Sequence, residues 1–273
     1  MILRPGLFPR LSVGGISILQ TAALLLPLAV VVFERGNAQA QLLAVALLTA
    51  IFWDLIFAIL RKRKFYFHGV SIALIVAVLV PPTLPLWQLA LTLSLGCVIG
   101  EHVFGGRGFG FLSPAAICLS LLLLSFPQVQ LEPMSQNVAL ATVPGALLLL
   151  ISGLVSWRVI LGAFVVIVGL ALSSNLDVDV FSLGIATLFG LVFLTGDPVS
   201  AASTNPGRWI YGLLAGFLIS IFSQDSTLIT SAGIVFGSLT ASVFAPLIDH
   251  LIVLAKAKSR LARSTRRRRQ NLA

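Results

Sequence analysis

The chain has 273 residues and a formal net charge of +9, and it is 58% hydrophobic but only 10% charged. Soluble globular domains average about 45–50% apolar and about 25% charged residues, so this composition excludes a water-soluble globular fold. The basic excess lies in short polar segments and at the end of the chain, where it is typical of membrane topology rather than of nucleic-acid binding.

Apolar runs recur along the whole chain and leave no polar block large enough for a second domain. A helix that crosses a bilayer needs about 20 apolar residues. We therefore predict an all-α, polytopic membrane protein with about ten transmembrane helices, forming a single transmembrane domain over residues 1–255, followed by a basic cytoplasmic tail over residues 256–273. The predicted spans lie near residues 16–33, 39–60, 69–83, 86–104, 112–126, 137–155, 157–173, 180–195, 208–223 and 229–254.

The charges assign the loops to sides of the membrane. If both termini are cytoplasmic, all 18 basic residues except Arg35 fall on the inner side, as the positive-inside rule requires. The acids Glu34, Glu132, Asp177, Asp179 and Asp225 then fall outside. We expect a multi-pass protein of a bacterial-type inner membrane, with a basic tail that binds anionic lipid and not nucleic acid.

The chain divides into two sets of five spans, over residues of about 16–126 and 137–254. An odd number of spans in each half predicts two repeats of inverted topology. The connections over residues 78–96 and 193–216 support this division, because each has an apolar segment ending in proline, a polar break, and then a proline and a tryptophan entering a glycine-containing helix. Transporter folds hold their ligands at such broken helices.

The first polar interruption, over residues 100–115, is rich in glycine. Glycine permits unusual dihedrals and close approach, and a Ser-Pro helix start directs free amides toward a ligand, so this loop is a candidate anion cradle. The alternative is a tight connection between two spans. The candidate binding residues are Gly105, Gly106, Gly108, Ser113 and Pro114.

The second interruption, over residues 195–209, is the most polar stretch flanked closely by apolar helices. Polar backbone at membrane depth must line a cavity or pack on protein. The alternative is a cytoplasmic loop in which Asp197 caps a helix and Arg208 follows the topology. The candidate binding residues are Asp197, Pro198, Ser200, Thr204, Asn205, Arg208 and Trp209.

Three acids in or near predicted spans are candidates for an ion path: Asp54, Glu101 and Asp249. The alternative is snorkelling toward the interface, since only seven residues separate Asp54 from Arg61.

The two cysteines, Cys97 and Cys118, are interpreted as buried inert thiols. Ligation of an iron-sulfur cluster shared with a partner chain is the sharper alternative. No spacing of metal ligands and no catalytic motif occurs, so we predict no metal site and no catalytic residues.

The segments VFGGRGFGFLSPA and FLTGDPVSAASTNPGRWIYG resemble the paired signatures of the RnfD/NqrB family of membrane subunits. The motifs at Pro81-Pro82, at Trp157-Arg158 and over residues 245–249 occur in the same order, so the resemblance covers most of the chain. It implies ten helices in two inverted five-helix repeats, similar to urea transporters. It also implies a flavin at the membrane, other membrane and redox subunits as partners, and electrons passing toward a quinone or ferredoxin.

The chain departs from this family between its halves. Family members carry covalent FMN on the threonine of an SGAT-type motif, but the corresponding stretch here is FPQVQLEPMSQNVA. Thr142 and Thr187 lie at other positions, within apolar segments. The usual GxN and FNPA patterns are also changed, at residues 108–110 and 112–115. Covalent FMN is therefore not expected, and any FMN or riboflavin would be held non-covalently.

Two functions of different classes follow. The first is an RnfD/NqrB-like membrane subunit of a redox-coupled, ion-translocating electron-transport complex, at most one subunit of a redox-driven ion translocase. The second is a stand-alone channel or transporter for a small polar solute on the same fold. A membrane scaffold without a ligand is a third.

Overall fold

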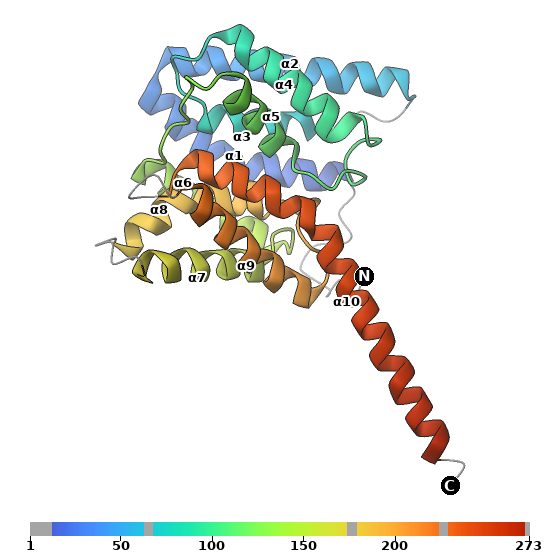
Figure 1. Ribbon diagram of the computed structural model, residues 1–273. Coiled ribbons are helices and arrows are strands. Elements are labelled where there is room, and N and C mark those ends of the chain that lie inside the picture. The colour runs from blue at the N-terminus through green and yellow to red at the C-terminus, as the bar shows by residue number, and fades with distance from the viewer. Residues whose placement is uncertain (1–12, 63–67, 174–178, 224–228, 271–273) are drawn as a thin grey trace.

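The computed structural model describes residues 13–62, 68–173, 179–223 and 229–270, with side chains omitted at residue 13 and over residues 259–270. These residues form α-helices and two short π-helical segments, which confirms the predicted all-α fold of ten helices (Figure 1). The elements are α1 (Val13–Arg35), α2 (Asn37–Leu60), α3 (His68–Leu79), α4 (Leu86–Cys97), η1 (Val98–His102), α5 (Pro114–Ser125), α6 (Gln136–Ile151), α7 (Trp157–Ser173), α8 (Val180–Gly190), η2 (Leu191–Thr195), α9 (Asn205–Phe222) and α10 (Ser231–Gln270).

Three helical segments are long and apolar enough to cross a bilayer: Gly14–Arg35, Asn37–Leu60 and Ser231–Lys258. Others are shorter, as expected for tilted or broken helices. Large apolar side chains remain exposed around the body, for example Phe33 at 91% and Leu48 at 69%. Such a surface requires a lipid environment. The exception is α3, whose side chains are almost all buried among the helices of the first half.

A proline break ends α3, as its sequence predicted. Pro81 and Pro82 cannot continue the helix, which would leave its last carbonyl groups without donors. Arg35 donates to the carbonyls of Val78 and Val80 at 3.1 Å each, and the Gln39 side chain donates to that of Ala77. The second half has a related break, where α8 continues as η2 and ends at the predicted polar loop.

The two halves use corresponding helix pairs. In the first half α2 packs on α4, α4 on α5 and α1 on α3; in the second α7 packs on α9, α9 on α10 and α6 on α8. Contacts of α1 with α6 and of α5 with α10 join the halves, which lie one above the other in Figure 1. This correspondence supports a two-repeat organisation, whose inversion stays a prediction.

Glycines allow the closest helix contacts. Gly212 and Gly216 of α9 lie against the backbone of Val159 and Ala163 on α7, and Gly145 of α6 lies against the carbonyl of Ala23 on α1. Small residues at this spacing let helix backbones approach each other in membranes. The interpretation of Gly212 and Gly216 as packing residues is therefore confirmed.

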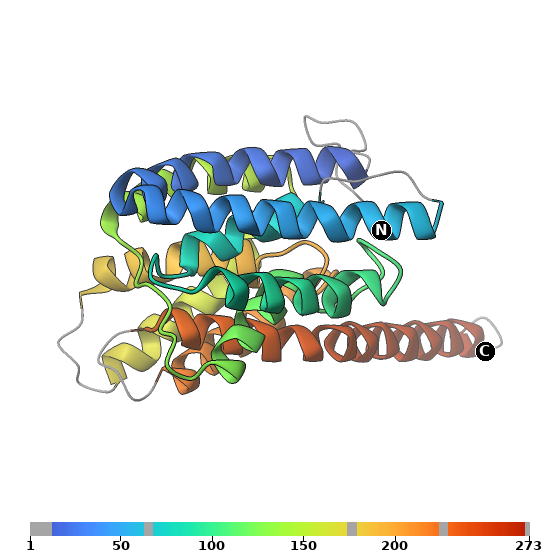
Figure 2. The same ribbon diagram turned by 90° about the horizontal axis from the view of Figure 1, so that it is seen from above.

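The last helix does not stop at the end of the predicted domain. Helix α10 runs without a break from Ser231 to Gln270, so the stretch predicted as a basic tail continues the last span. Figure 2 shows α10 extending beyond the helical body at the same end as the end of α2. Arg4, Arg10, Arg63, Lys64, Asp177 and Asp225, which were used to assign topology, lie outside the described residues.

Candidate functional site

The glycine loop between η1 and α5 is held in left-handed backbone conformations. Gly105, Gly106 and Gly108 have φ values of 112°, 101° and 92°, which side chains other than glycine rarely adopt. The loop folds back on η1, because the amide of Gly106 donates to the carbonyl of Glu101 at 3.0 Å and that of Gly105 to His102 at 3.2 Å. These two amides are thus used within the loop, whereas the anion cradle predicted from the sequence would have presented them to a ligand.

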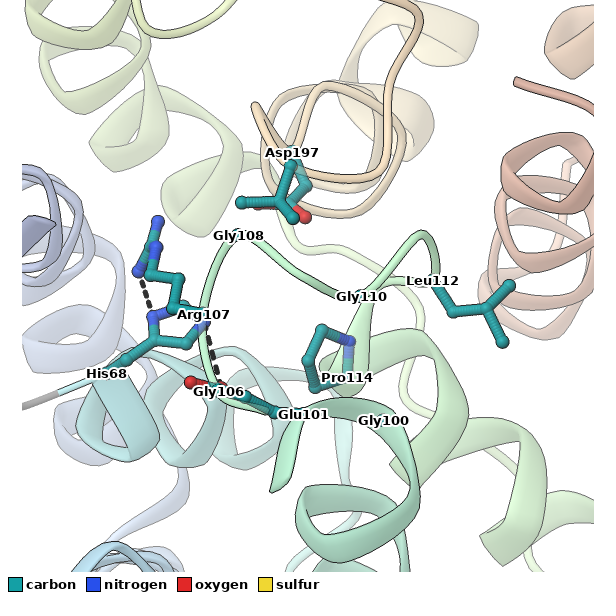
Figure 3. A pocket seen from close by; sticks show the side chains of 11 residues that line it. His68, Gly100, Glu101, Gly106, Arg107, Gly108, Gly110, Leu112, Pro114 and Asp197 are labelled. Carbon is teal, nitrogen blue, oxygen red and sulfur yellow. Dashed lines mark hydrogen bonds and ion pairs between the residues drawn. The ribbon is translucent and has the colours of Figure 1, made fainter. Parts of the chain in front are cut away.

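This backbone turns the side chain of Arg107 inward. Its guanidinium donates to Gln20 Oε1 at 2.7 Å and to Ser17 Oγ at 3.1 Å, and it contacts Nδ1 of His68 (Figure 3). Burial lowers the pKa of Arg107, but a guanidinium keeps its charge in proteins. The loop therefore places a fixed positive charge among the helices of the first half.

Two histidine-carboxylate pairs lie beside this arginine. Nε2 of His68 is 3.4 Å from Oε2 of Glu101, and Nε2 of His102 is 3.3 Å from Oδ1 of Asp54. All four side chains are less than a tenth exposed. The other Asp54 oxygen accepts a hydrogen bond from the amide of Gly69 at 2.9 Å. Asp54 is therefore held inside the protein and does not snorkel toward the interface.

The polar loop of the second half approaches the same place. Asp197 is 5% exposed and lies across the glycine loop from Glu101 in Figure 3. Its Oδ2 accepts a hydrogen bond from Ser200 Oγ at 3.1 Å. Burial raises the pKa of Asp197, and the charge of Arg107 opposes that rise. We call Asp54, His68, Glu101, His102, Arg107 and Asp197 the buried charge cluster.

A small pocket lies between the two loops. It is lined by His68, Gly100, Glu101, Gly106, Arg107, Gly108, Gly110, Leu112, Pro114, Asp197 and Val199. Its empty volume of about 240 Å³ is below the roughly 300–1,000 Å³ of pockets that enclose drug-sized ligands. The pocket thus suits an ion or a single polar group and does not enclose the three-ring system of a flavin.

Asp249 has a different role from the other two candidate acids. Its carboxylate accepts from the amide and hydroxyl of Ser203 at 2.6 and 2.9 Å, and from those of Thr204 at 3.0 and 2.6 Å. Thr204 Oγ1 in turn accepts from the amide of Gly207 at 3.2 Å and caps α9. These contacts give Asp249 a structural role at the start of α9.

The remaining candidates of the second loop lie at the surface near the start of α9. Asn205 accepts a hydrogen bond from Arg158 at 3.4 Å, and Trp209 packs edge-on against Trp157 with ring centroids 5.6 Å apart. Arg208 donates to the carbonyl of Ala202 at 3.4 Å. None of these residues lines the pocket that contains Asp197. Pro198 lines a separate small space, and Ser113 is buried where α5 begins.

Sequence reasoning missed two members of the cluster. His68 was not singled out, although the chain has only three histidines and His68 begins an apolar helix. Arg107 was interpreted only as one more inward charge. Among the described residues, no group of three or more histidine, cysteine or acidic side chains is placed to hold a metal ion. Cys97 and Cys118 are free and at most 2% exposed, so neither offers a face for a shared cluster.

Replacing Asp249 by alanine is expected to lower the free energy of unfolding by about 1–3 kcal/mol, because charge-assisted hydrogen bonds that cap α9 are lost. Thermal unfolding in mild detergent measures the change. The matched control is Asp179→Ala, since Asp179 caps α8 from an exposed position with a bond of 3.2 Å to the amide of Phe181. Equal losses in the two variants would contradict the structural role of Asp249.

Known proteins similar to this chain come from one family. The model of the NQR2, RnfD, RnfE family matches residues 4–136 and 131–258. A membrane-complex relative, one subunit of the Na(+)-translocating NADH-quinone reductase of Ectopseudomonas mendocina (strain ymp), is 31% identical, over 81% of this chain and 68% of that protein. The corresponding protein of Klebsiella pneumoniae (strain 342) is 32% identical, over 78% and 66%. That of Stutzerimonas stutzeri (strain A1501) is 28% identical, over 90% and 71%. The chain thus spans about two thirds of the length of these relatives.

Proposed function

The chain belongs to the NQR2, RnfD, RnfE family, and from this premise we propose that it is an integral membrane subunit of a redox-coupled, ion-translocating electron-transport complex. One observation carries the proposal: the signature loops of the two halves meet at the buried charge cluster, which has Arg107 from one loop and Asp197 from the other. Ionisable groups buried in a membrane protein are rare and mark ion pathways.

The proposed ion path uses Asp54, Glu101 and Asp197. Asp54 and Glu101 come from α2 and η1 of the first half, and Asp197 enters from the second half. A path at the junction of the halves agrees with the location of sites in inverted-repeat transporters. Asp249 is left out of this path because it caps α9.

A non-covalent flavin, FMN or riboflavin, is proposed only at an interface with another subunit. The pocket is too small to enclose the ring system, but Phe104, Phe109 and Phe111 of the glycine loop are exposed by 39%, 68% and 38%. Aromatic faces of this kind stack on planar rings. No step of electron transfer is assigned to residues of this chain.

Covalent FMN is not part of the proposal. The alignment with the Ectopseudomonas protein has 279 positions but takes in 81% of this chain, about 221 residues, so about 58 positions have no residue here. The family match changes from its first to its second segment at residues 131–136, between α5 and α6. A shortened connection between the halves agrees with the missing threonine motif.

We further propose that the end of the molecule with Arg61, Arg158 and Arg208 faces the cytoplasm of a bacterial-type inner membrane. The partners would be other membrane and redox subunits, together with anionic lipid near the basic end of α10. The arrangement of two inverted repeats belongs to this proposal as well.

A stand-alone channel or transporter for a small polar solute is the second candidate. The shortened connection between the halves favours it, because that is where the family pattern places its flavin. Such a protein would move its solute without any reductant.

Gentle purification of the full chain from its native membrane tests the proposal. The visible spectrum is expected to show a flavin, and acid precipitation is expected to release it into the supernatant because it is not covalently bound. Redox subunits are expected to co-purify. A colourless protein that purifies alone would contradict the redox proposal and favour the channel.

A further inference from the structure

The buried charge cluster has an excess of negative groups. Its three carboxyl groups, Asp54, Glu101 and Asp197, face one guanidinium, that of Arg107. With both imidazoles neutral, two negative charges are left without a compensating charge. An uncompensated charge is costly inside a membrane protein, so the cluster must bind cations or protons.

The ligand atoms in the cluster distinguish these two possibilities. Alkali and alkaline-earth cations are coordinated by several oxygen atoms, often from unwound backbone. Here the oxygens of Asp54 face the amide of Gly69 and Nε2 of His102, and an oxygen of Glu101 faces Nε2 of His68. The nearest partners of these carboxylates are therefore nitrogen atoms, each able to carry a proton.

We infer that the pairs His68–Glu101 and His102–Asp54 bind one proton each, so that the ion taken up at this cluster is H⁺ and not Na⁺. Uptake of one proton converts an imidazole and a carboxylate into an imidazolium-carboxylate pair, whose net charge changes from −1 to 0. Two protons thus compensate the two excess charges. The inference rests on the proposed function, because it names the ion that the complex would move.

Charged groups around each pair complete the description. His68, on α3, faces Arg107 from the glycine loop and Glu101 from η1. Glu101 also faces Asp54 and, from the second half, Asp197.

His102 is enclosed in a similar way on its other sides. It stacks on Phe57 with ring centroids 4.4 Å apart, and its carbonyl accepts a hydrogen bond from Arg61, which lies nearer the surface. Cys97 is the neighbouring thiol. The two pairs therefore form a short series from the half-exposed Arg61 to Asp197.

Nitrogen NMR of the full chain in lipid bilayers tests the inference, because the chain has only three histidines. Labelling histidine alone gives three imidazole environments, which His68→Gln, His102→Gln and His250→Gln assign. Titration with acid is expected to protonate the His68 and His102 imidazoles. Replacing choline chloride by sodium chloride at constant pH and ionic strength is expected to change neither signal.

Two carboxylate variants show whether the pairs act separately. Glu101→Gln is expected to lower the proton affinity of His68 about tenfold or more and to affect His102 much less, and Asp54→Asn the reverse, because each removes an opposite charge within about 4 Å. His250, which is exposed on α10, is the internal reference for both variants.

The outcomes separate this inference from the proposed function. Imidazoles that stay neutral at every pH at which the protein is folded would overturn the inference, as would a change in either signal on adding sodium. Both results come from the wild-type chain and need no variant that folds. Neither bears on whether a flavin or redox subunits co-purify, which decides the proposed function by itself.

Discussion

Replacing Arg107 by glutamine is expected to abolish reductant-driven ion transport and to lower the free energy of unfolding by about 2–4 kcal/mol. Removal of one partner of a buried ion pair typically destabilises by about 3–5 kcal/mol, and Arg107 is itself partly exposed, which reduces the effect. The variant leaves the cluster with three carboxyl groups and no fixed positive charge. It also removes hydrogen bonds to Ser17 and Gln20 on α1.

Ion accumulation in membrane vesicles and unfolding in detergent measure the two effects. Arg158→Gln is the matched control, because Arg158 lies at the same end of the molecule, where it faces Asn205 and Trp157 and no carboxylate of the cluster. It is expected to keep ion transport within about twofold and to change stability by less than about 1 kcal/mol. Full transport by Arg107→Gln would contradict the role of the cluster.

Replacing Gly145 by alanine is expected to destabilise the protein by about 1–3 kcal/mol, and Gly145→Leu is expected to prevent folding. A Cβ atom at this position would meet the backbone carbonyl of Ala23, and a backbone atom cannot move aside without shifting α1 against α6. These helices join the two halves of the molecule, so the effect is larger than that of a surface change.

Gly169→Ala is the control for this prediction. Gly169 also lies within a helix, α7, but nothing lies within 4 Å of a Cβ atom built there. Alanine is favoured over glycine in helices by about 0.8–1 kcal/mol, so this variant is expected to be as stable as the wild type or more stable. Thermal unfolding of both variants in the same detergent makes the comparison. Equal stability of Gly145→Ala and Gly169→Ala would show that α1 and α6 are not closely packed.

The helices and their breaks followed from local rules. Apolar runs long enough to span a bilayer predicted the ten helices, and Pro81-Pro82 predicted the end of α3. The placement of side chains around the site did not follow, because it depends on contacts between distant segments. His68 lies 33 positions before Glu101, and only the packing of α3 beside η1 brings their side chains together.

The two polar loops show where sequence patterns succeed and fail. Glycine density marked the first loop correctly as unusual backbone, but the inward turn of Arg107 depends on three positive φ values that composition alone does not give. In the second loop the residues fall into two groups. Asp197 points to the cluster, whereas Ser203 and Thr204 bind Asp249 across 45 or more positions of sequence.

Redox-driven ion movement in inverted membrane vesicles tests the central proposal most directly. Vesicles that contain the wild-type chain with its native partners are expected to accumulate ions only after a reductant is added, and vesicles with Arg107→Gln are expected to accumulate none. Solute or ion movement through the wild-type chain that is independent of reductant, and that Arg107→Gln leaves unchanged, would contradict the account.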